Sequence, residues 1–316
     1  MRIAVLDDYQ NVARDMADWS VIETDAEVTV FNAPLGGLEQ VAATLDAFEI
    51  IAIMRERTPF PRTLFERLPN LQLLVTTGMR NKSIDLEAAG DHGVTVCGTS
   101  SPGRSTVELT WALILAAARH LVAEDRSVRT GGWQTALGLD LQGKVLGIIG
   151  LGRLGSQVAE IAKAFRMDVV AWSPNLTAER AAECGARLVT KDDLLATADI
   201  VTIHMVLSEK TTDLLTAPDL DRMKPTAWLV NCSRGPLVNE GDLIRCLEAG
   251  KIAGAALDVY DEEPLPADHP VRRLGNTILS PHKGYVTEET YRVFYEGTVE
   301  AIRAWLDGEP VRVLSP

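Results

Sequence analysis

Short apolar runs alternate with amphipathic segments along nearly all of this 316-residue chain. Each run has the length of a buried strand, and the segments between runs have the spacing of helices with one apolar face. This alternation predicts an α/β fold of parallel sheets with helices on both faces. The first series of predicted strands covers 2–6, 28–31, 50–54, 73–76 and 94–97, and the second covers 145–149, 169–172, 200–203, 227–231, 253–258 and 277–279.

The two series indicate two doubly wound units joined by a linker-like stretch at Ser100–Gly103. A predicted helix at about 288–306 comes after the second series is complete. We expect this helix to return to the first unit, so that residues 1–100 plus 286–316 form one domain and residues 101–285 the other, with a cleft between them. Ligands of open α/β sheets bind beyond the carboxyl ends of strands, so residues directly after strands are the candidate functional residues.

Composition narrows the class of protein. No apolar run approaches the roughly 20 residues of a membrane span, and Met1–Asp8 lacks the features of a signal peptide, so we expect a cytoplasmic protein without a membrane partner. The net charge of −13 argues against nucleic-acid binding, which usually needs a basic face. No metal site is expected, because the cysteines form no CxxC pair and are predicted to be buried, reduced thiols: Cys97, Cys184, Cys232 and Cys246.

A glycine-rich turn joins the predicted strand at 145–149 to a predicted helix at 156–165. In such a pattern the first glycine permits a tight turn, the second lets backbone approach a phosphate, and the third lets the helix pack on the strand. The helix N-terminus adds free N–H groups and the positive end of a dipole. The pattern therefore predicts a dinucleotide-binding site, although a glycine-rich turn alone is weak evidence. Its residues are Gly150, Leu151, Gly152, Arg153, Leu154 and Gly155.

Arg234, Glu263 and His282 each follow a predicted strand of the second series and form a chemical set. Histidine titrates near neutral pH and can exchange a proton with a substrate oxygen. A neighbouring carboxylate would orient the imidazole and favour its protonated form, while arginine offers a planar fork to a substrate carboxylate. The set suits hydride transfer between a nicotinamide and a hydroxyl or carbonyl carbon. The alternative interpretation is that Arg234 and Glu263 are surface charges and that His282 caps the backbone of a loop.

At these residues the chain resembles the D-isomer-specific 2-hydroxyacid dehydrogenase family over essentially its whole length. The motifs are the glycine turn at 150–155, Val-Asn-x-x-Arg-Gly at 230–235, Asp-Val-x-x-x-Glu-Pro at 258–264 and Pro-His-x-Gly at 281–284. The resemblance implies a flavodoxin-like substrate domain, a Rossmann cofactor domain and a small 2-hydroxy or 2-keto acid as substrate. It also implies a homodimer formed largely by the cofactor domain, with a segment near 126–133 reaching the partner.

The resemblance assigns roles residue by residue. Arg234 would bind the substrate carboxylate and polarise its carbonyl, His282 would be the acid or base, and Glu263 would pair with His282. Asp258 would lie near the nicotinamide carboxamide, unless it caps a turn at the strand end. The further cofactor contacts are expected at Ser173, His204 and Cys232, and the substrate loop corresponds to Gly78, Met79 and Arg80, whose backbone N–H groups would receive the carboxylate.

Some positions depart from the usual pattern of the family. Met79 and Arg80 stand where small or apolar residues are common, Lys283 stands where an apolar residue is usual, and Tyr285 stands where a small one is frequent. Together with Arg55, these residues could form a cationic site for a substrate with a second negative group, but we favour solvated side chains on loops. The chain stops soon after the returning helix, so we expect no regulatory domain like that of long phosphoglycerate dehydrogenases.

Cofactor choice depends on the residue after the strand at 169–172, which is Ser173. NAD-specific members of this fold carry an acid at that position, and its charge repels the 2′-phosphate of NADP. Because serine lacks this charge, the chain is expected to accept NAD or NADP with a relaxed preference.

Alternatives remain for the function. Within the same chemistry, the substrate specificity could be that of a phosphoglycerate dehydrogenase or of a glyoxylate or hydroxypyruvate reductase. A different class is a non-catalytic, dinucleotide-sensing protein, since the family includes transcriptional corepressors. The enzyme is favoured because Arg234, Glu263 and His282 are all retained.

Overall fold

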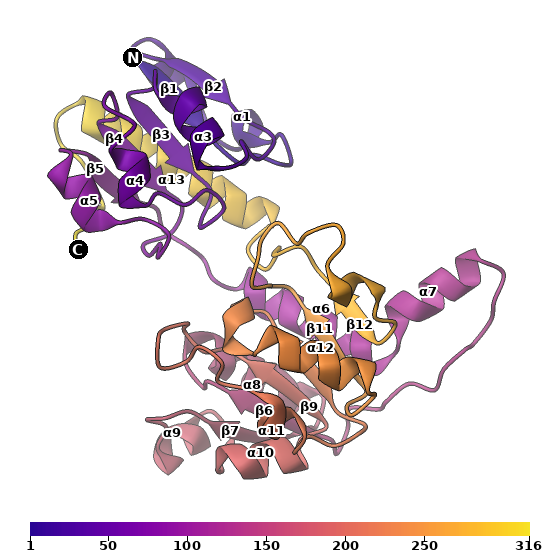
Figure 1. The fold of residues 1–316 in the computed structure, drawn as a ribbon. Coiled ribbons are helices and arrows are strands. Elements are labelled where there is room, and N and C mark those ends of the chain that lie inside the picture. Colours follow the sequence, from indigo (N-terminus) through magenta and orange to yellow (C-terminus); the bar gives the residue numbers. More distant parts are fainter. The chain divides into compact units, whose positions relative to one another are not determined.

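The structure, a computed structural model, describes residues 1–316. The chain divides into unit 1, made of Met1–Pro102 and Val286–Pro316, and unit 2, made of Gly103–Tyr285 (Figure 1). Each unit contains one parallel sheet with helices on both faces, which confirms the predicted α/β fold class.

The sheet of unit 1 has the strand order β2-β1-β3-β4-β5. All neighbouring strands are parallel, and this is the flavodoxin-like order. Each strand begins within one residue of its predicted start. The bounds are β1 (Arg2–Val5), β2 (Glu27–Val30), β3 (Ile50–Ile53), β4 (Leu73–Thr76) and β5 (Thr95–Gly98).

Helices cover both faces of this sheet because successive strand residues point to opposite sides. Ala4 and Leu6 belong to the apolar cluster that includes residues of α3 (Leu38–Leu45), α4 (Arg62–Phe65) and α5 (Leu86–Asp91). The long helix α13 (Glu288–Leu306) contacts β4 and β5, and it also contacts α1 (Ala13–Met16) and α2 (Ser20–Glu23).

The last residues of the chain complete unit 1. Beyond α13, the backbone N–H of Leu314 donates to Val96 O at 2.8 Å, and the N–H of Gly98 donates to Arg312 O at 3.0 Å. An antiparallel bridge pairs Cys97 with Val313. The outer edge of β5 is therefore covered by residues more than two hundred positions later in the sequence.

The sheet of unit 2 has the strand order β12-β11-β10-β9-β6-β7-β8, which is a Rossmann order with one additional strand. The short edge strand β8 was not predicted, because it holds only Arg187 and Leu188 and offers no apolar run. The chain order reverses at β6, which lies between β7 and β9. The bounds are β6 (Val145–Ile149), β7 (Asp168–Trp172), β8 (Arg187–Leu188), β9 (Ile200–Ile203), β10 (Trp228–Asn231), β11 (Gly254–Leu257) and β12 (Thr277–Leu279).

Two apolar clusters fill the two faces of this sheet. One contains residues of α6 (Ser105–Ala118), α8 (Arg153–Ala164) and α9 (Ala178–Glu183). The other contains residues of α10 (Lys191–Thr197), α11 (Ala217–Leu220) and α12 (Glu240–Glu248). Short 3-10 turns at Gly235–Leu237 and Pro270–Arg273 follow β10 and precede β12.

Helix α7 (Leu121–Arg129) differs from the other helices of unit 2 because none of its residues is buried. No single helix combines the length and apolarity needed to cross a membrane; α6 and α7 meet that test only as a pair, and they are bent by 62° relative to each other. All four cysteines are free thiols.

Candidate active site

The glycine turn follows β6 at the point where the strand order reverses. Gly150 has a φ of +99°, and a Cβ placed there would lie 2.6 Å from the carbonyl oxygen of His204. A Cβ on Gly155 would lie 2.1 Å from Gly150 O, so the third glycine lets α8 approach the turn. Gly152 has open space where a side chain would stand. The first and third glycines are therefore required by packing, and the second leaves room for a ligand.

Free N–H groups at the start of α8 suit an anionic group. The N–H of Ser156 donates to Gly152 O at 2.9 Å, which leaves the N–H groups of Arg153, Leu154 and Gly155 without a helical acceptor. No side chain caps this helix. A pyrophosphate would be held by these donors and by the helix dipole, so the residues present fit a dinucleotide.

Ser173 directly follows β7 and faces the glycine turn. Its Oγ accepts a hydrogen bond from the N–H of Leu151 at 3.2 Å. The hydroxyl thus links the end of β7 to the turn, and no carboxylate stands at this position.

His204 and Cys232 follow β9 and β10. The Nε2 atom of His204 lies 3.0 Å from Thr202 Oγ1, Nδ1 has no hydrogen-bond partner, and burial lowers the pKa of the imidazole to about 4. Burial also raises the pKa of the Cys232 thiol to about 12. Both side chains are therefore neutral near pH 7, and their assignment to cofactor binding stays a prediction.

The turn that carries Arg234 is closed by Asn231 at the end of β10. The Asn231 side chain donates to Arg234 O at 2.9 Å and accepts from the N–H of Ser233 at 3.0 Å. A Cβ on Gly235 would lie 2.1 Å from the carbonyl carbon of Tyr260, so the Arg-Gly pair brings this turn against the loop after β11. The Arg234 guanidinium donates to Ser233 O at 2.7 Å.

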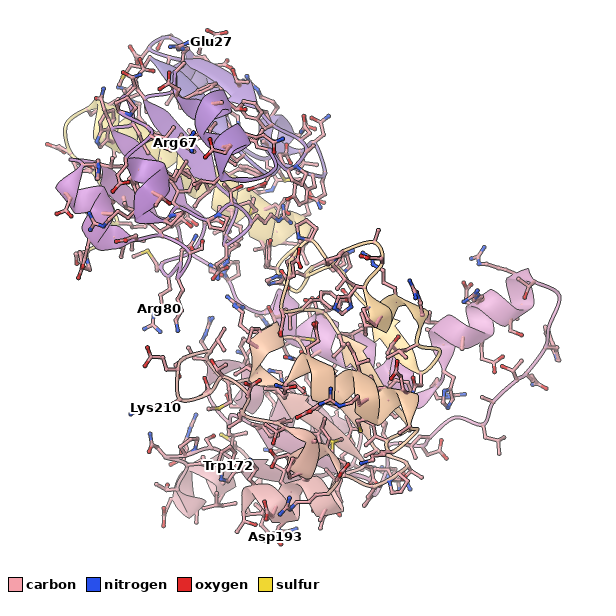
Figure 2. All side chains as sticks on the ribbon, in the orientation of Figure 1. Glu27, Arg67, Arg80, Trp172, Asp193 and Lys210 are labelled. Atoms are coloured by element: carbon pink, nitrogen blue, oxygen red, sulfur yellow. The ribbon has the colours of Figure 1, made fainter.

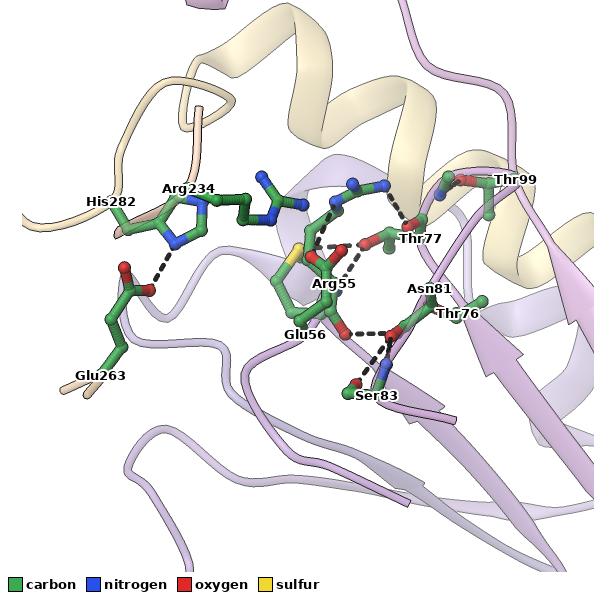
Figure 3. A network of polar contacts seen from close by, with 12 residues as sticks. Arg55, Glu56, Thr76, Thr77, Asn81, Ser83, Thr99, Arg234, Glu263 and His282 are labelled. Carbon is green, nitrogen blue, oxygen red and sulfur yellow. Dashed lines mark hydrogen bonds and ion pairs between the residues drawn. The ribbon is translucent and has the colours of Figure 1, made fainter. Parts of the chain in front are cut away.

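Glu263 and His282 form an ion pair and hydrogen bond between Oε2 and Nδ1, drawn in Figure 3. The other carboxylate oxygen, Oε1, accepts the backbone N–H of Tyr260 at 2.9 Å. The Tyr260 hydroxyl in turn donates to Leu257 O and Ser280 O, at the ends of β11 and β12. With Nδ1 bonded to Glu263, the Nε2 atom of His282 is the one left to exchange a proton.

Asp258, at the end of β11, holds the loop on both sides of His282. Only 1% of Asp258 is exposed. Its Oδ1 accepts Ser280 Oγ–H at 2.5 Å and the N–H of Lys283 at 2.8 Å, and its Oδ2 accepts the N–H of Gly284 at 2.9 Å. Burial raises the pKa of this carboxyl, and the hydrogen bonds from Ser280 and Lys283 oppose that rise.

In unit 1, Arg55 follows β3 in a left-handed conformation with φ +55°. Its backbone N–H donates to Thr77 Oγ1 at 2.9 Å, its guanidinium donates to Thr77 O at 3.0 Å, and its carbonyl accepts from the Asn81 side chain at 2.7 Å (Figure 3). Gly78 has a φ of +85°, and a Cβ there would lie 2.0 Å from a nitrogen of Arg55. The turns after β3 and β4 are thus fixed to each other.

The three residues assigned to the substrate loop differ in their free donors. The N–H of Gly78 donates to Thr99 Oγ1 at 2.9 Å and is therefore already bonded within unit 1. The N–H groups of Met79 and Arg80 have no such acceptor, and Met79 is 47% exposed. The Arg80 side chain extends outward without an acidic partner (Figure 2). Met79 and Arg80 are thus the positions of this loop with donors to offer.

Comparison with known proteins decides the family. Residues 111–284 match the model of the protein family described as "D-isomer specific 2-hydroxyacid dehydrogenase, NAD binding domain". The chain belongs to the D-isomer-specific 2-hydroxyacid dehydrogenase family. As a member, this dehydrogenase is an oxidoreductase that transfers hydride between a nicotinamide cofactor and C2 of a small 2-hydroxy or 2-keto acid.

Relatives of the dehydrogenase carry more than one specific name. It is 42% identical to a glyoxylate reductase of Aeropyrum pernix over 239 residues, which cover 72% of this chain and 71% of the relative. It is 36% identical over 279 residues to a D-3-phosphoglycerate dehydrogenase of Archaeoglobus fulgidus, covering 87% of this chain but only 52% of that protein. The crystal structure of a putative D-3-phosphoglycerate dehydrogenase from Ralstonia solanacearum has a TM-score of 0.94 and 37% identity, covering 100% of this chain and 97% of the other.

Sequence reasoning missed the residues that hold the functional loops of the dehydrogenase. Thr77, Asn81 and Thr99 fix the turns of unit 1, and Ser280 and Tyr260 fix the loops of unit 2. Most are short polar side chains just after a buried strand, and that position is the signal that could have revealed them.

Proposed function

We propose that this dehydrogenase reduces a small 2-keto acid to the D-2-hydroxy acid, and catalyses the reverse reaction, with either NADH or NADPH. The Glu263–His282 pair carries the proposal, because it places an oriented imidazole after β12 in the unit that holds the glycine turn. A bound nicotinamide cofactor would supply the hydride that adds to C2.

His282 would donate a proton from Nε2 to the substrate oxygen as the hydride arrives, and would accept it in the reverse direction. Glu263 would hold the ring and stabilise its protonated form. The orientation of Glu263 is in turn supported by the backbone N–H of Tyr260, which donates to the second carboxylate oxygen.

Arg234 would bind the substrate carboxylate through its planar guanidinium and draw charge from the adjacent carbonyl. The backbone N–H groups of Met79 and Arg80 would supply further donors to the carboxylate, since Gly78 has already committed its own. Arg55 is the remaining substrate-contact prediction in unit 1, and its backbone is fixed by Thr77 and Asn81.

The cofactor would be held by Gly150, Gly152 and the start of α8, with Asp258, His204 and Cys232 as further predicted contacts. Relaxed cofactor preference is supported by Ser173, whose hydroxyl lies beside the turn where NAD-specific members have an acid.

The deciding experiment measures kcat/KM for a panel of 2-keto acids, including glyoxylate, hydroxypyruvate and phosphohydroxypyruvate, with NADH and with NADPH. His282→Ala should lower kcat by roughly a hundredfold to ten-thousandfold and leave cofactor affinity nearly unchanged. His92→Ala, at the end of α5 in unit 1, is the matched control and should keep parental kinetics. A protein that binds dinucleotide but reduces no acid of the panel would instead support the dinucleotide-sensing alternative.

The same panel tests whether the departures at Arg55, Arg80 and Lys283 select a substrate. The structure bonds the Arg55 guanidinium to Thr77 O, so Arg55 is not solvated as expected. If Arg80 and Lys283 are solvated, as we favour, Arg80→Ala should change kcat/KM for glyoxylate and for phosphohydroxypyruvate by the same factor. A selective loss with phosphohydroxypyruvate would support a cationic site for a second negative group.

A homodimer is supported by the exposed apolar side chains in and after α7. Leu121, Val122 and Val128 are more than half exposed, Trp133 is 76% exposed and Leu137 is 96% exposed. Exposed apolar patches often mark interfaces. Sedimentation should give a dimer for the parent and a monomer for Val128→Asp, whereas Val21→Asp on α2 should leave the mass unchanged. Cytoplasmic location and the absence of nucleic-acid and membrane partners remain predictions.

A further inference from the structure

The proton-donating histidine has an unusual backbone. His282 has a φ of +48°, in the left-handed region that residues with side chains seldom adopt. It lies in neither helix nor strand, and it comes shortly after β12 ends at Leu279. Regular secondary structure therefore does not hold it in this conformation, and other contacts must do so.

Those contacts come from Asp258. Its carbonyl accepts the N–H of His282 at 2.7 Å, and its carboxylate accepts the backbone N–H groups of the next two residues, Lys283 and Gly284. The Ser280 hydroxyl completes the set from the other side of His282. Asp258 thus accepts hydrogen bonds from residues before, at and after the histidine, at positions 280, 282, 283 and 284.

The geometry of Gly284 supports this arrangement. A Cβ on Gly284 would lie 3.1 Å from Asp258 Oδ2 and 3.4 Å from the side chain of Thr106. Thr106, in the first turn of α6, donates from Oγ1 to Gly284 O at 3.1 Å. Both backbone groups of Gly284 are therefore bonded, and the loop that leaves His282 is held at its far end as well.

We infer that Asp258 is a positioning residue for the proton donor, holding the 280–284 loop so that His282 keeps its left-handed backbone and presents Nε2 to the substrate oxygen. The inference rests on the proposed role of His282. It gives Asp258 a role other than direct contact with the nicotinamide carboxamide, since both carboxylate oxygens already accept hydrogen bonds within the loop.

Two variants weaken the contacts to different extents. Asp258→Asn keeps the size of the side chain but turns one acceptor into a donor that faces either Ser280 and Lys283 or Gly284. Ser280→Ala removes one donor and leaves the carboxylate in place. Because misplacement of a reacting group by about 1 Å can cost about a hundredfold in rate, kcat should fall roughly ten- to hundredfold in Asp258→Asn and several-fold in Ser280→Ala. KM for the keto acid should change less than kcat, since Arg234 is untouched.

Asp199→Asn is the matched control. Asp199 also accepts a backbone N–H, from Val145 at 2.8 Å, and it pairs with Lys224 at 2.9 Å. It stands just before β9, at the opposite end of the strands from His282. This variant should lower thermal stability and keep the parental kcat.

A cofactor analogue separates positioning from direct contact. In 3-acetylpyridine adenine dinucleotide a methyl group replaces the carboxamide NH₂. If Asp258 acts through the loop, the ratio of dissociation constants for the reduced analogue and NADH should be the same in the parent and in Asp258→Asn. The solvent deuterium isotope effect on kcat should rise in the variant, because proton donation becomes slower.

The outcomes distinguish the inference from the function on which it rests. Full activity of His282→Ala would overturn the proposed function. If His282→Ala is inactive while Asp258→Asn and Ser280→Ala keep parental kcat, the positioning role is wrong and the function stands. If the ratio of the dissociation constants for the reduced analogue and NADH instead moves toward one in Asp258→Asn, Asp258 contacts the carboxamide directly. Should Asp258→Asn fail to fold, the kcat and isotope effect of Ser280→Ala decide the question.

Discussion

Glu263 binds Nδ1 of His282 through one carboxylate oxygen and the backbone N–H of Tyr260 through the other. A hydrogen bond within its own loop therefore orients the Glu263 carboxylate toward His282. Two loops that follow neighbouring strands, β11 and β12, are joined at this point. Both members of the pair belong to unit 2.

Replacing Glu263 by glutamine should move the pH dependence of reduction. The substitution keeps the acceptor for Tyr260 N–H but removes the negative charge that stabilises protonated His282. Reduction requires that protonated form, so the rate should begin to fall at a lower pH than in the parent, and kcat at neutral pH should drop by roughly tenfold or more. The measurement is kcat against pH with chemistry shown to be rate-limiting. Glu262→Gln, the exposed neighbour, should keep the parental profile; an unshifted profile in Glu263→Gln would argue against the pairing role.

Replacing Arg234 by alanine should affect binding and chemistry together. If the guanidinium holds the carboxylate in the ground state and in the transition state, KM should rise and kcat should fall, with a combined loss in kcat/KM on the order of a thousandfold or more. Steady-state kinetics with the best 2-keto acid provide the check. Arg245→Ala removes an exposed arginine of α12 and should leave both constants unchanged; a loss confined to KM would limit Arg234 to ground-state binding.

Replacing Ser173 by aspartate should turn a tolerant enzyme into an NAD-preferring one. The parent is expected to discriminate between NADH and NADPH by less than about a hundredfold, a contrast of under roughly 3 kcal/mol. A carboxylate beside the glycine turn would repel the 2′-phosphate and lower kcat/KM for NADPH. The ratio of kcat/KM for the two cofactors should be measured in both proteins. A parent that already rejects NADPH more than a thousandfold, or a ratio that does not move, would mean that Ser173 does not face the ribose.

Asp261 should make the stability of unit 2 depend on pH. Asp261 is exposed at the surface, but the loss of part of its hydration, together with the negative charges of Glu240 and Asp213, raises the pKa of its carboxyl to about 6. Its protonated form is thus favoured in the folded protein, and the associated stability is present below about pH 4 and lost as the pH rises through 6. Asp261→Asn should therefore raise the free energy of unfolding above pH 7, by about 1 kcal/mol once solvent screening is allowed for, and should have little effect at pH 4. Thermal midpoints at the two pH values check this, with the exposed Asp268→Asn as control.

The elements of the fold were largely predictable because buried parallel strands consist of short runs of apolar residues. The ranges of β4, β6, β9, β12 and α13 match their predicted ranges. β8 was missed since a two-residue edge strand carries no such run. The glycine pattern also located the turn before α8, because two of its glycines are required by contacts under 3 Å.

The hydrogen bonds of the candidate site were less predictable. Asp258 and Gly284 are 26 positions apart, and Gly78 and Thr99 are 21 apart. A sequence pattern shows that each of these residues follows a strand, but it does not show which donor reaches which acceptor. The N–H of Gly78 was expected to be available to a substrate, and the structure shows it bonded to Thr99 instead.

The strand-like segment at the end of the chain has a consequence for how the protein is made. Unit 2 is one continuous stretch, Gly103–Tyr285, and all of its strands are synthesised before α13. Unit 1 begins the chain, yet one face of β4 and β5 and the outer edge of β5 stay uncovered until α13 and residues 312–314 are made. Domains usually fold during synthesis in order from the N-terminus. Here we expect the first unit to stay incomplete while the whole of the second unit is synthesised, and during that period the apolar face that α13 later covers is open to chaperones.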